Sequence, residues 1–361
     1  MTRRSRDIVA VSIFWMNLIQ EYIRRYEHSR WANEPERPTS GFAWGIQHIG
    51  GHANEPDPVA FLEAFADRTI AESDAWFDGT SARDYHLDPR RGTVPGEAGV
   101  LTFTSAIQSP WPENNVVYGR FFPARHSGPA AIVLGQWNAR WDQYADICRW
   151  LNLMGITALK LSLPYHDRRA IPEHPRADHL IGPNIGLTMQ ANRQAVSDVR
   201  RAARWLAAQG YGKIGVLGAS IGSSVGFIAL AHDKDIHAGA FLHVSTFFGG
   251  VVATGLTTMH VWEAIRGKIS PDDLRRYWAP ISPQPYFHKL RGSAKKCLAI
   301  IGENDPTFSP EYSEDFLFAM WEQGFNYEVL KMPCGHYSLG ESPFKYIAGF
   351  RLGTFLFQAL A

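Results

Sequence analysis

Three side chains of this sequence have the types and the chain order that nucleophilic acyl transfer requires. Ser220 stands between two glycines in Gly-Ala-Ser-Ile-Gly, Asp305 follows in Glu-Asn-Asp-Pro, and His336 comes last in Pro-Cys-Gly-His. A serine hydroxyl is a weak nucleophile that needs a base, and a histidine base needs a carboxylate to orient its ring. The sequence therefore predicts a triad of Ser220, His336 and Asp305 that attacks an ester or amide carbonyl.

The motif around Ser220 is short enough to occur by chance, so its surroundings carry the argument. An apolar run over 214–217 precedes it, and a helix-like apolar run over 225–230 follows it. A sharp turn between a strand and a helix projects its central side chain outward, and flanking glycines remove the Cβ atoms that would clash there. We expect the backbone N–H of Ile221, in the first turn of that helix, to form one half of an oxyanion hole.

The predicted acid and base each follow an apolar strand. Asp305 comes directly after the strand over 297–302, and His336 comes after the strand over 327–331. In a parallel sheet the carboxyl ends of the strands meet at one edge, where this fold class binds ligands. Glu303 is the alternative acid, but it lies nearer the strand. Cys334 we interpret as a small apolar residue of the core.

The loop after the strand over 130–134 is predicted to complete the oxyanion hole. It reads Gly-Gln-Trp-Asn, and the backbone N–H of Trp137 is the expected second donor, with Gln136 as its alternative and as a substrate-binding candidate.

A second loop, Pro-Tyr-His-Asp-Arg-Arg after the strand over 156–163, opens at the same predicted edge. Its two arginines would suit an acidic or phosphate-bearing substrate, and the alternative is that they shape the loop through ion pairs. Its substrate-binding candidates are Tyr165, His166, Arg168 and Arg169.

From residue 99 onward, strands alternate with helices, which predicts an α/β fold with a doubly wound, mostly parallel sheet. Asn184 is expected to cap a long helix, and one of the later strands is expected over 238–244. The stretch 247–292 is too long for an ordinary crossover, and Ser270 followed by Pro271 is typical of a helix start. We expect a helical lid here, over the edge that carries the triad. Its large apolar side chains favour an acyl chain or an aromatic acid as substrate: Phe247, Phe248, Met259, Trp262, Tyr277 and Trp278.

These motifs resemble the alpha/beta-hydrolase superfamily over residues 99–361. The runs Leu-Pro-Tyr-His-Asp-Arg-Arg, Gly-Ala-Ser-Ile-Gly and Pro-Cys-Gly-His-Tyr are similar to those of bacterial proteins related to alpha/beta-hydrolase domain-containing protein eighteen. The resemblance implies a Ser-Asp-His hydrolase with Ser220, Asp305 and His336 at the matching positions. Many superfamily members carry a His-Gly pair where this chain has Gly135 and Gln136, so the oxyanion loop departs from the pattern.

Residues 1–95 are predicted to form a helical extension ahead of a catalytic domain over 96–361. This extension is expected to consist of helices and loops, with its second helix near 57–76. The apolar run over 8–19 is shorter than the roughly 20 residues that span a membrane. We expect an amphipathic helix packed on its own domain or on a second subunit in a homodimer, and peripheral contact with a membrane is the alternative.

The bulk composition excludes several classes of function. With 36 Lys and Arg against 35 Asp and Glu, the chain has no charge excess that would favour nucleic acid. Three cysteines without a CxxC pair predict no disulfide framework, no zinc site and a reducing, cytoplasmic location. No metal or organic cofactor is expected.

The leading hypothesis is therefore hydrolysis of a small-molecule carboxylic ester through an acyl-enzyme. Amide or peptide hydrolysis on the same triad is the first alternative. A membrane-docking protein that uses the fold without catalysis is the second.

Overall fold

A computed structural model describes residues 3–34, 37, 39–89, 94–126, 128–174 and 176–361, and the side chains from Leu18 onward. Its centre is a nine-stranded sheet with the order β1-β2-β3-β5-β4-β6-β7-β8-β9. The pairs that involve β1, β2 or β3 are antiparallel, and all others are parallel. The strands are β1 (His86–Asp88), β2 (Gly99–Thr104), β3 (Val116–Phe122), β4 (Ala130–Leu134), β5 (Thr157–Leu161), β6 (Ile214–Ala219), β7 (Ile236–Leu242), β8 (Lys296–Gly302) and β9 (Tyr327–Met332).

The parallel part of the sheet has a switch point at β4. The chain passes from β4 to β5 on one side and later returns to β6 on the other side of β4. At such a point the loops that leave neighbouring strands diverge and open a crevice at their carboxyl ends. The loop after β4 and the turn after β6, which carries Ser220, flank this crevice.

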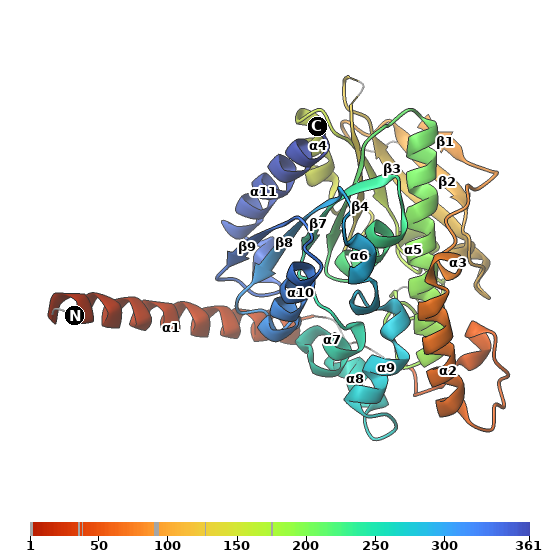
Figure 1. Cartoon of the computed structure of the whole chain (residues 1–361), viewed down its shortest axis with the longest axis horizontal. Coiled ribbons are helices and arrows are strands. Elements are labelled where there is room, and N and C mark those ends of the chain that lie inside the picture. The colour runs from red at the N-terminus through yellow and green to blue at the C-terminus, as the bar shows by residue number, and fades with distance from the viewer. Residues whose placement is uncertain (1–2, 35–36, 38, 90–93, 127, 175) are drawn as a thin grey trace.

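Helices cover both faces of the sheet, as the alternating pattern predicted (Figure 1). One core holds apolar residues of α5 (Ile185–Ala208), α6 (Ile221–His232) and α10 (Pro310–Glu322). The other core lies on the opposite face, under α4 (Ala145–Leu153) and α11 (Phe344–Ala359). The predicted start of α5 is confirmed, since the Asn184 side chain accepts a hydrogen bond from Leu187 N at 3.0 Å.

The stretch between β7 and β8 is helical, as expected. It holds α7 (Phe248–Thr254), η5 (Leu256–Thr258), α8 (Met259–Ile265), α9 (Pro271–Tyr277), η6 (Ala279–Ile281) and η7 (Gln284–Leu290). Ser270 caps α9, because its hydroxyl accepts from Asp273 N at 3.1 Å. Figure 1 shows α7, α8 and α9 beyond the carboxyl ends of the strands.

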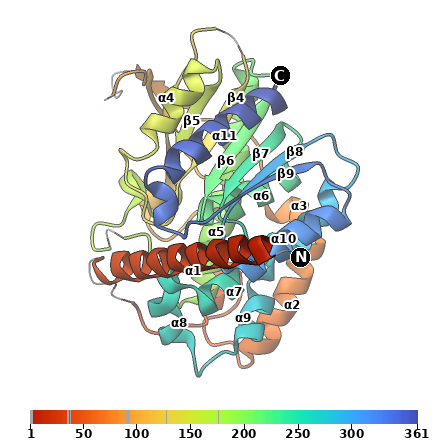
Figure 2. The ribbon, with the colours of Figure 1, turned by 90° about the vertical axis from the view of Figure 1, so that its left-hand side faces the viewer.

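The N-terminal region packs on this insertion and also joins the sheet. α1 (Arg3–Ala32) crosses between the sheet and the insertion helices in the view of Figure 2, and Figure 1 shows that its N-terminal part projects from the body. α2 (Pro58–Ala71) contacts α9 through an ion pair between Glu63 and Arg276 at 2.7 Å.

Two expectations for this region need correction. The helix expected over 57–76 is broken at Glu72 into α2 and α3 (Ser73–Trp76). The expectation of helices and loops alone is wrong for His86–Asp88, because this segment pairs with β2 as the edge strand β1. Within the described part of the chain, no helix is long and apolar enough to cross a membrane. The basic end of α1, with Arg3, Arg4 and Arg6, lies outside the described side chains.

Candidate active site

Ser220 occupies a tight turn between β6 and α6. Its backbone has φ 56° and ψ −120°, a strained conformation for a residue with a side chain. A Cβ on Gly218 would lie 2.2 Å from the carbonyl oxygen of Gly222, and one on Gly222 would lie 2.7 Å from that of Gly135. Both motif glycines are therefore required by the close approach of backbone atoms.

Four adjacent parallel strands deliver the polar side chains of the site. Ser220 follows β6, His243 follows β7, Asp305 lies just beyond β8 and His336 just beyond β9. Because parallel strands end at one edge, these residues gather at the same place although they are far apart in the chain. Ser220, Asp305 and His336 were predicted from the sequence, and His243 was not.

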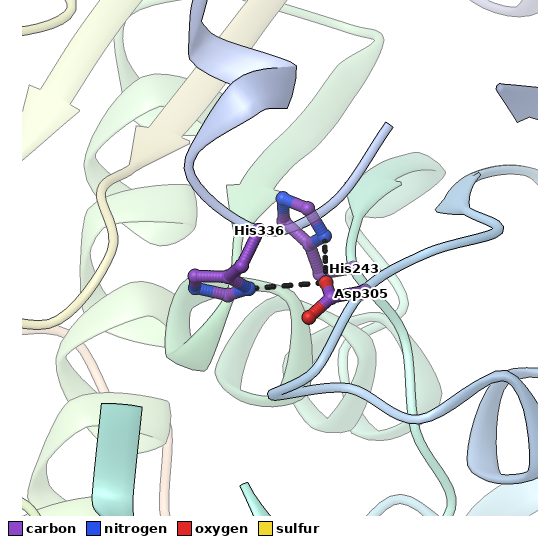
Figure 3. Close-up of side chains that lie close together, drawn as sticks. All are labelled: His243, Asp305 and His336. Carbon is purple, nitrogen blue, oxygen red and sulfur yellow. Dashed lines mark hydrogen bonds and ion pairs between the residues drawn. The ribbon is translucent and has the colours of Figure 1, made fainter. Parts of the chain in front are cut away.

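Asp305 is buried, and both of its carboxylate oxygens have polar neighbours. Its Oδ1 accepts from the backbone N–H groups of Thr307 at 2.7 Å and Phe308 at 2.9 Å. Its Oδ2 lies 3.1 Å from His336 Nδ1 and 2.7 Å from His243 Nδ1 (Figure 3). Burial works to raise the pKa of Asp305, but the two histidines hold it well below its usual range, so the group is a carboxylate at neutral pH.

His336 is held by this carboxylate and by an aromatic neighbour. Its ring stacks on Phe308 with 5.5 Å between centroids and 8° between planes. Burial lowers the pKa of His336, but Asp305 more than offsets this, so the pKa is raised overall. Ser220 Oγ makes no hydrogen bond with the His336 ring here, and both residues line the same cavity. Such bonds are often long in ligand-free enzymes and tighten on substrate binding.

His243 is a residue that sequence reasoning missed. A strand was predicted over 238–244, so His243 was assigned to its interior, whereas β7 ends at Leu242 and His243 has a left-handed φ of 59°. Its ring centroid lies 4.4 Å from that of His336. Burial and the nearby His336 lower the pKa of His243, although Asp305 acts in the opposite direction.

The donor atoms of His243, Asp305 and His336 lie within 4.8 Å of one another, and among the described residues no other group is arranged to hold a metal ion. Two histidines and a carboxylate suit zinc. A metal in this position would occupy His336 Nδ1, which in a triad must carry a proton toward Asp305.

The loop after β4 lies beside Ser220, and Gln136 and Trp137 both line the cavity. Asn138 fixes this loop, because its N–H donates to His166 Nε2 at 2.9 Å and its side-chain oxygen accepts from Ala177 N at 2.8 Å. Burial lowers the pKa of His166 to about 4, which keeps Nε2 free to accept. His166 therefore supports the predicted oxyanion loop.

The expectation that Tyr165, His166, Arg168 and Arg169 bind substrate needs correction, since none of them lines the cavity. Tyr165 is buried in the core. Arg168 stacks over the Trp141 ring at 4.5 Å. Arg169 is fully buried, where it pairs with Asp198 at 2.9 Å and donates to the carbonyls of Asn114 and Ser162. A buried guanidinium has to be paired in this way, so the arginine shapes the loop.

Neither the alternative acid Glu303 nor the thiol of Cys334 takes part in the proposed reaction. Glu303 is exposed and does not line the cavity. Cys334 is buried, and burial raises the pKa of its thiol to about 12, so it is not a nucleophile at neutral pH.

The cavity beside Ser220 has a volume of about 860 Å³, within the range of small-molecule sites. Its lining residues include Ser220, Ile221, His243 and His336. Charged residues line part of the cavity, among them Arg30, Arg37 and Arg176. The insertion contributes a wall of three apolar residues of α7 and two threonines of η5. Its lining residues there are Phe248, Val251, Val252, Thr257 and Thr258.

One family model matches part of this chain. Residues 186–348 match the model of the prolyl oligopeptidase family, a stretch that contains Ser220, Asp305 and His336. No curated protein matches the chain in sequence.

Solved structures with the same fold include both esterases and peptidases. An esterase from Pyrococcus furiosus has a TM-score of 0.53 and 17% identity, over 77% of this chain and 92% of that one. An acetyl xylan esterase from Thermoanaerobacterium sp. has a TM-score of 0.61 and 13% sequence identity, and the match covers 81% of this chain and 93% of that one. An acylaminoacyl peptidase from Pyrococcus horikoshii has a TM-score of 0.57 and 12% sequence identity, and the match covers 72% of this chain but 41% of that one.

The chain has the α/β-hydrolase fold. The family match covers part of the chain, and the solved structures show likeness in fold.

Proposed function

We propose that the protein hydrolyses a carboxylic ester with an apolar acyl group, using Ser220 as nucleophile, His336 as base and Asp305 as the orienting acid. The observation that carries the proposal is the contact between Asp305 and His336 at the edge of the cavity that Ser220 also lines. In this proposal the turn at Ser220 is a nucleophile elbow and the insertion is a lid. The finer resemblance to the group of alpha/beta-hydrolase domain-containing protein eighteen, and a cytoplasmic location, belong to the same proposal.

The chemistry follows from the arrangement. Ser220 Oγ attacks the carbonyl carbon while His336 takes its proton, and Asp305 stabilises the imidazolium that forms. The N–H groups of Ile221 and Trp137 bind the oxyanion. When the tetrahedral intermediate collapses, His336 gives the proton to the leaving alcohol and an acyl-Ser220 ester remains. Water, activated by His336, then hydrolyses that ester and restores Ser220.

The apolar side chains of α7 in the cavity, Phe248, Val251 and Val252, favour an ester with a hydrophobic acyl group, because methylene groups that pack on them leave water. Esters and amides use the same triad, and the solved structures include enzymes of both names. Matched chromogenic substrates with one acyl group, linked as an ester or as an anilide, separate the two. We expect the ester to be turned over faster by at least a factor of 100, and faster cleavage of the anilide would favour the peptidase alternative.

A further inference from the structure

The cavity beside Ser220 does not end beneath the insertion. It continues on the face of the sheet that α4 and α11 cover, where Leu217 and Ala219 of β6 form its floor. Its walls there are Ile147 of α4 and residues of α11, the two helices that lie over the same face in Figure 2. The residues of α11 are Ala348, Gly349 and Leu352. We call this part of the cavity the α4–α11 arm.

A glycine keeps the arm open. A Cβ on Gly349 would have Ile147 Cδ1 as its nearest neighbour, at 4.0 Å, which is ordinary van der Waals contact. The α11 helix thus presents no side chain at the point where it faces Ile147. The charged lining residues that lie on α4, on α11 or in the turn before α11 are exposed: Asp146, Glu341 and Lys345.

We propose that the α4–α11 arm binds the acyl chain of the substrate, and that this chain is longer than that of an acetate or butyrate ester. This inference rests on the proposed function and deepens it. The arm is continuous with Ser220 and its floor is apolar, so methylene groups that enter it leave water. Each buried methylene strengthens binding by up to about fourfold.

Esters of one chromogenic alcohol, from acetyl to octanoyl, test the proposal. We expect kcat/KM of the wild type to rise with acyl length. In Gly349→Leu the new side chain fills the arm, so the ratio of octanoyl to acetyl kcat/KM falls at least tenfold. Gly349→Ala should give a smaller fall. Gln358→Leu, at an exposed position on the same helix, is the matched control and should keep the wild-type ratio.

The substitution is compatible with the helix, because Gly349 has no positive φ and leucine is a better helix former than glycine. A wild type that prefers acetyl, or a Gly349→Leu variant with an unchanged ratio, would overturn the assignment of the arm. Labelling of Ser220 by a fluorophosphonate separates this failure from that of the proposed function: a labelled enzyme without chain-length preference refutes only the arm.

A different observation concerns the loop that carries His336. Glu27 of α1 is fully buried, and its carboxylate accepts the backbone N–H groups of Tyr337 and Ser338, each at 2.8 Å. A Cβ on Gly335 would lie 2.5 Å from Glu27 Cδ, so the residue before His336 must be small for the carboxylate to fit. The N-terminal helix thereby holds the two residues that follow His336.

We infer that Glu27 is a positioning residue for His336, acting through this loop, and that α1 completes the site. Bonds from N–H groups to a charged acceptor are stronger than neutral ones, and here both bonds fix the same short segment. The inference again rests on the proposed function. The charged or titratable groups that act on His336 are Asp305, His243, Glu27 and Glu34.

Glu27→Gln removes the charge and one of the two acceptor oxygens. We expect kcat to fall about 10- to 100-fold with KM unchanged, since small displacements of a catalytic group have effects of this size. The negative charge of Glu27 contributes to raising the pKa of His336, so the acid limb of kcat/KM should also move to lower pH. Glu27→Asp retains the charge and should keep the limb in place.

Glu21→Gln on the same helix is the matched control, because Glu21 is partly exposed and pairs only with Arg24 and Arg25 among the described residues. An unchanged kcat and pH limb in Glu27→Gln would refute the positioning role. If Glu27→Gln lowers both the activity and the melting temperature but leaves the acid limb of the kcat/KM profile in place, Glu27 acts in folding alone. A wild type that neither turns over esters nor reacts with a fluorophosphonate would instead refute the proposed function.

Discussion

Ser220→Ala is expected to lower kcat for every ester by at least about 10⁴-fold, because the variant has no nucleophile to form an acyl-enzyme. The proposed oxyanion amides and the cavity are unchanged in this variant, so a small residual rate should persist. KM should change little. Measurement of chromogenic ester turnover, with intact-mass analysis after treatment with a fluorophosphonate, tests both parts.

Labelling adds the sharper criterion. The wild type should gain one phosphonyl group on Ser220, and Ser220→Ala should gain none. Ser293→Ala is the control, because Ser293 hydrogen-bonds to the carbonyl of Leu290 and does not line the cavity. Stoichiometric labelling of Ser220→Ala would show that the nucleophile lies elsewhere.

Asp305→Asn should lower kcat by about 10⁴-fold while the fold survives. The amide oxygen of asparagine can still accept from Thr307 N and Phe308 N, so the loop after β8 keeps its bonds. What is lost is the acceptor for His336 Nδ1, and with it the tautomer that leaves Nε2 free to take the proton of Ser220.

The same variant has a predicted pH signature. Asp305 raises the pKa of His336, so its neutralisation lowers that pKa, and the remaining activity should extend to lower pH. A kcat/KM profile from pH 4 to 9 measures this shift. Glu303→Gln is the control for the alternative acid, because Glu303 is exposed and lies outside the cavity. A larger loss in Glu303→Gln than in Asp305→Asn would reverse the assignment.

Local signals in the sequence determined the elements and their order. The apolar run over 130–134 is β4 without any change of bounds, and the caps at Asn184 and Ser270 start the helices that they predicted. These features depend on neighbours in the chain, such as a side chain that bonds to an amide three residues later, so they can be read from sequence. The meeting of Ser220, Asp305 and His336 could also be predicted, because each follows a strand and parallel strands end at one edge of the sheet.

Contacts between distant segments were decided only by the tertiary structure. Arg169 looked like a ligand for an anion, but its partner Asp198 lies on α5, and only packing brings the two together in the interior. His243 was hidden within a predicted strand, because nothing local marks the residue at which β7 ends. Glu27 and the loop of His336 are more than 300 residues apart in the sequence, and no pattern links them.

The triad candidates were therefore determined by the sequence, through types and order of residues at strand ends. Only the tertiary structure shows the second histidine on Asp305, the bond between His166 and the loop after β4, and the bonds of Glu27 to the loop of His336. It also shows that the cavity extends between α4 and α11. The physical reason is that secondary structure and strand order follow from short-range patterns, whereas a buried charge finds its partner only when distant elements pack.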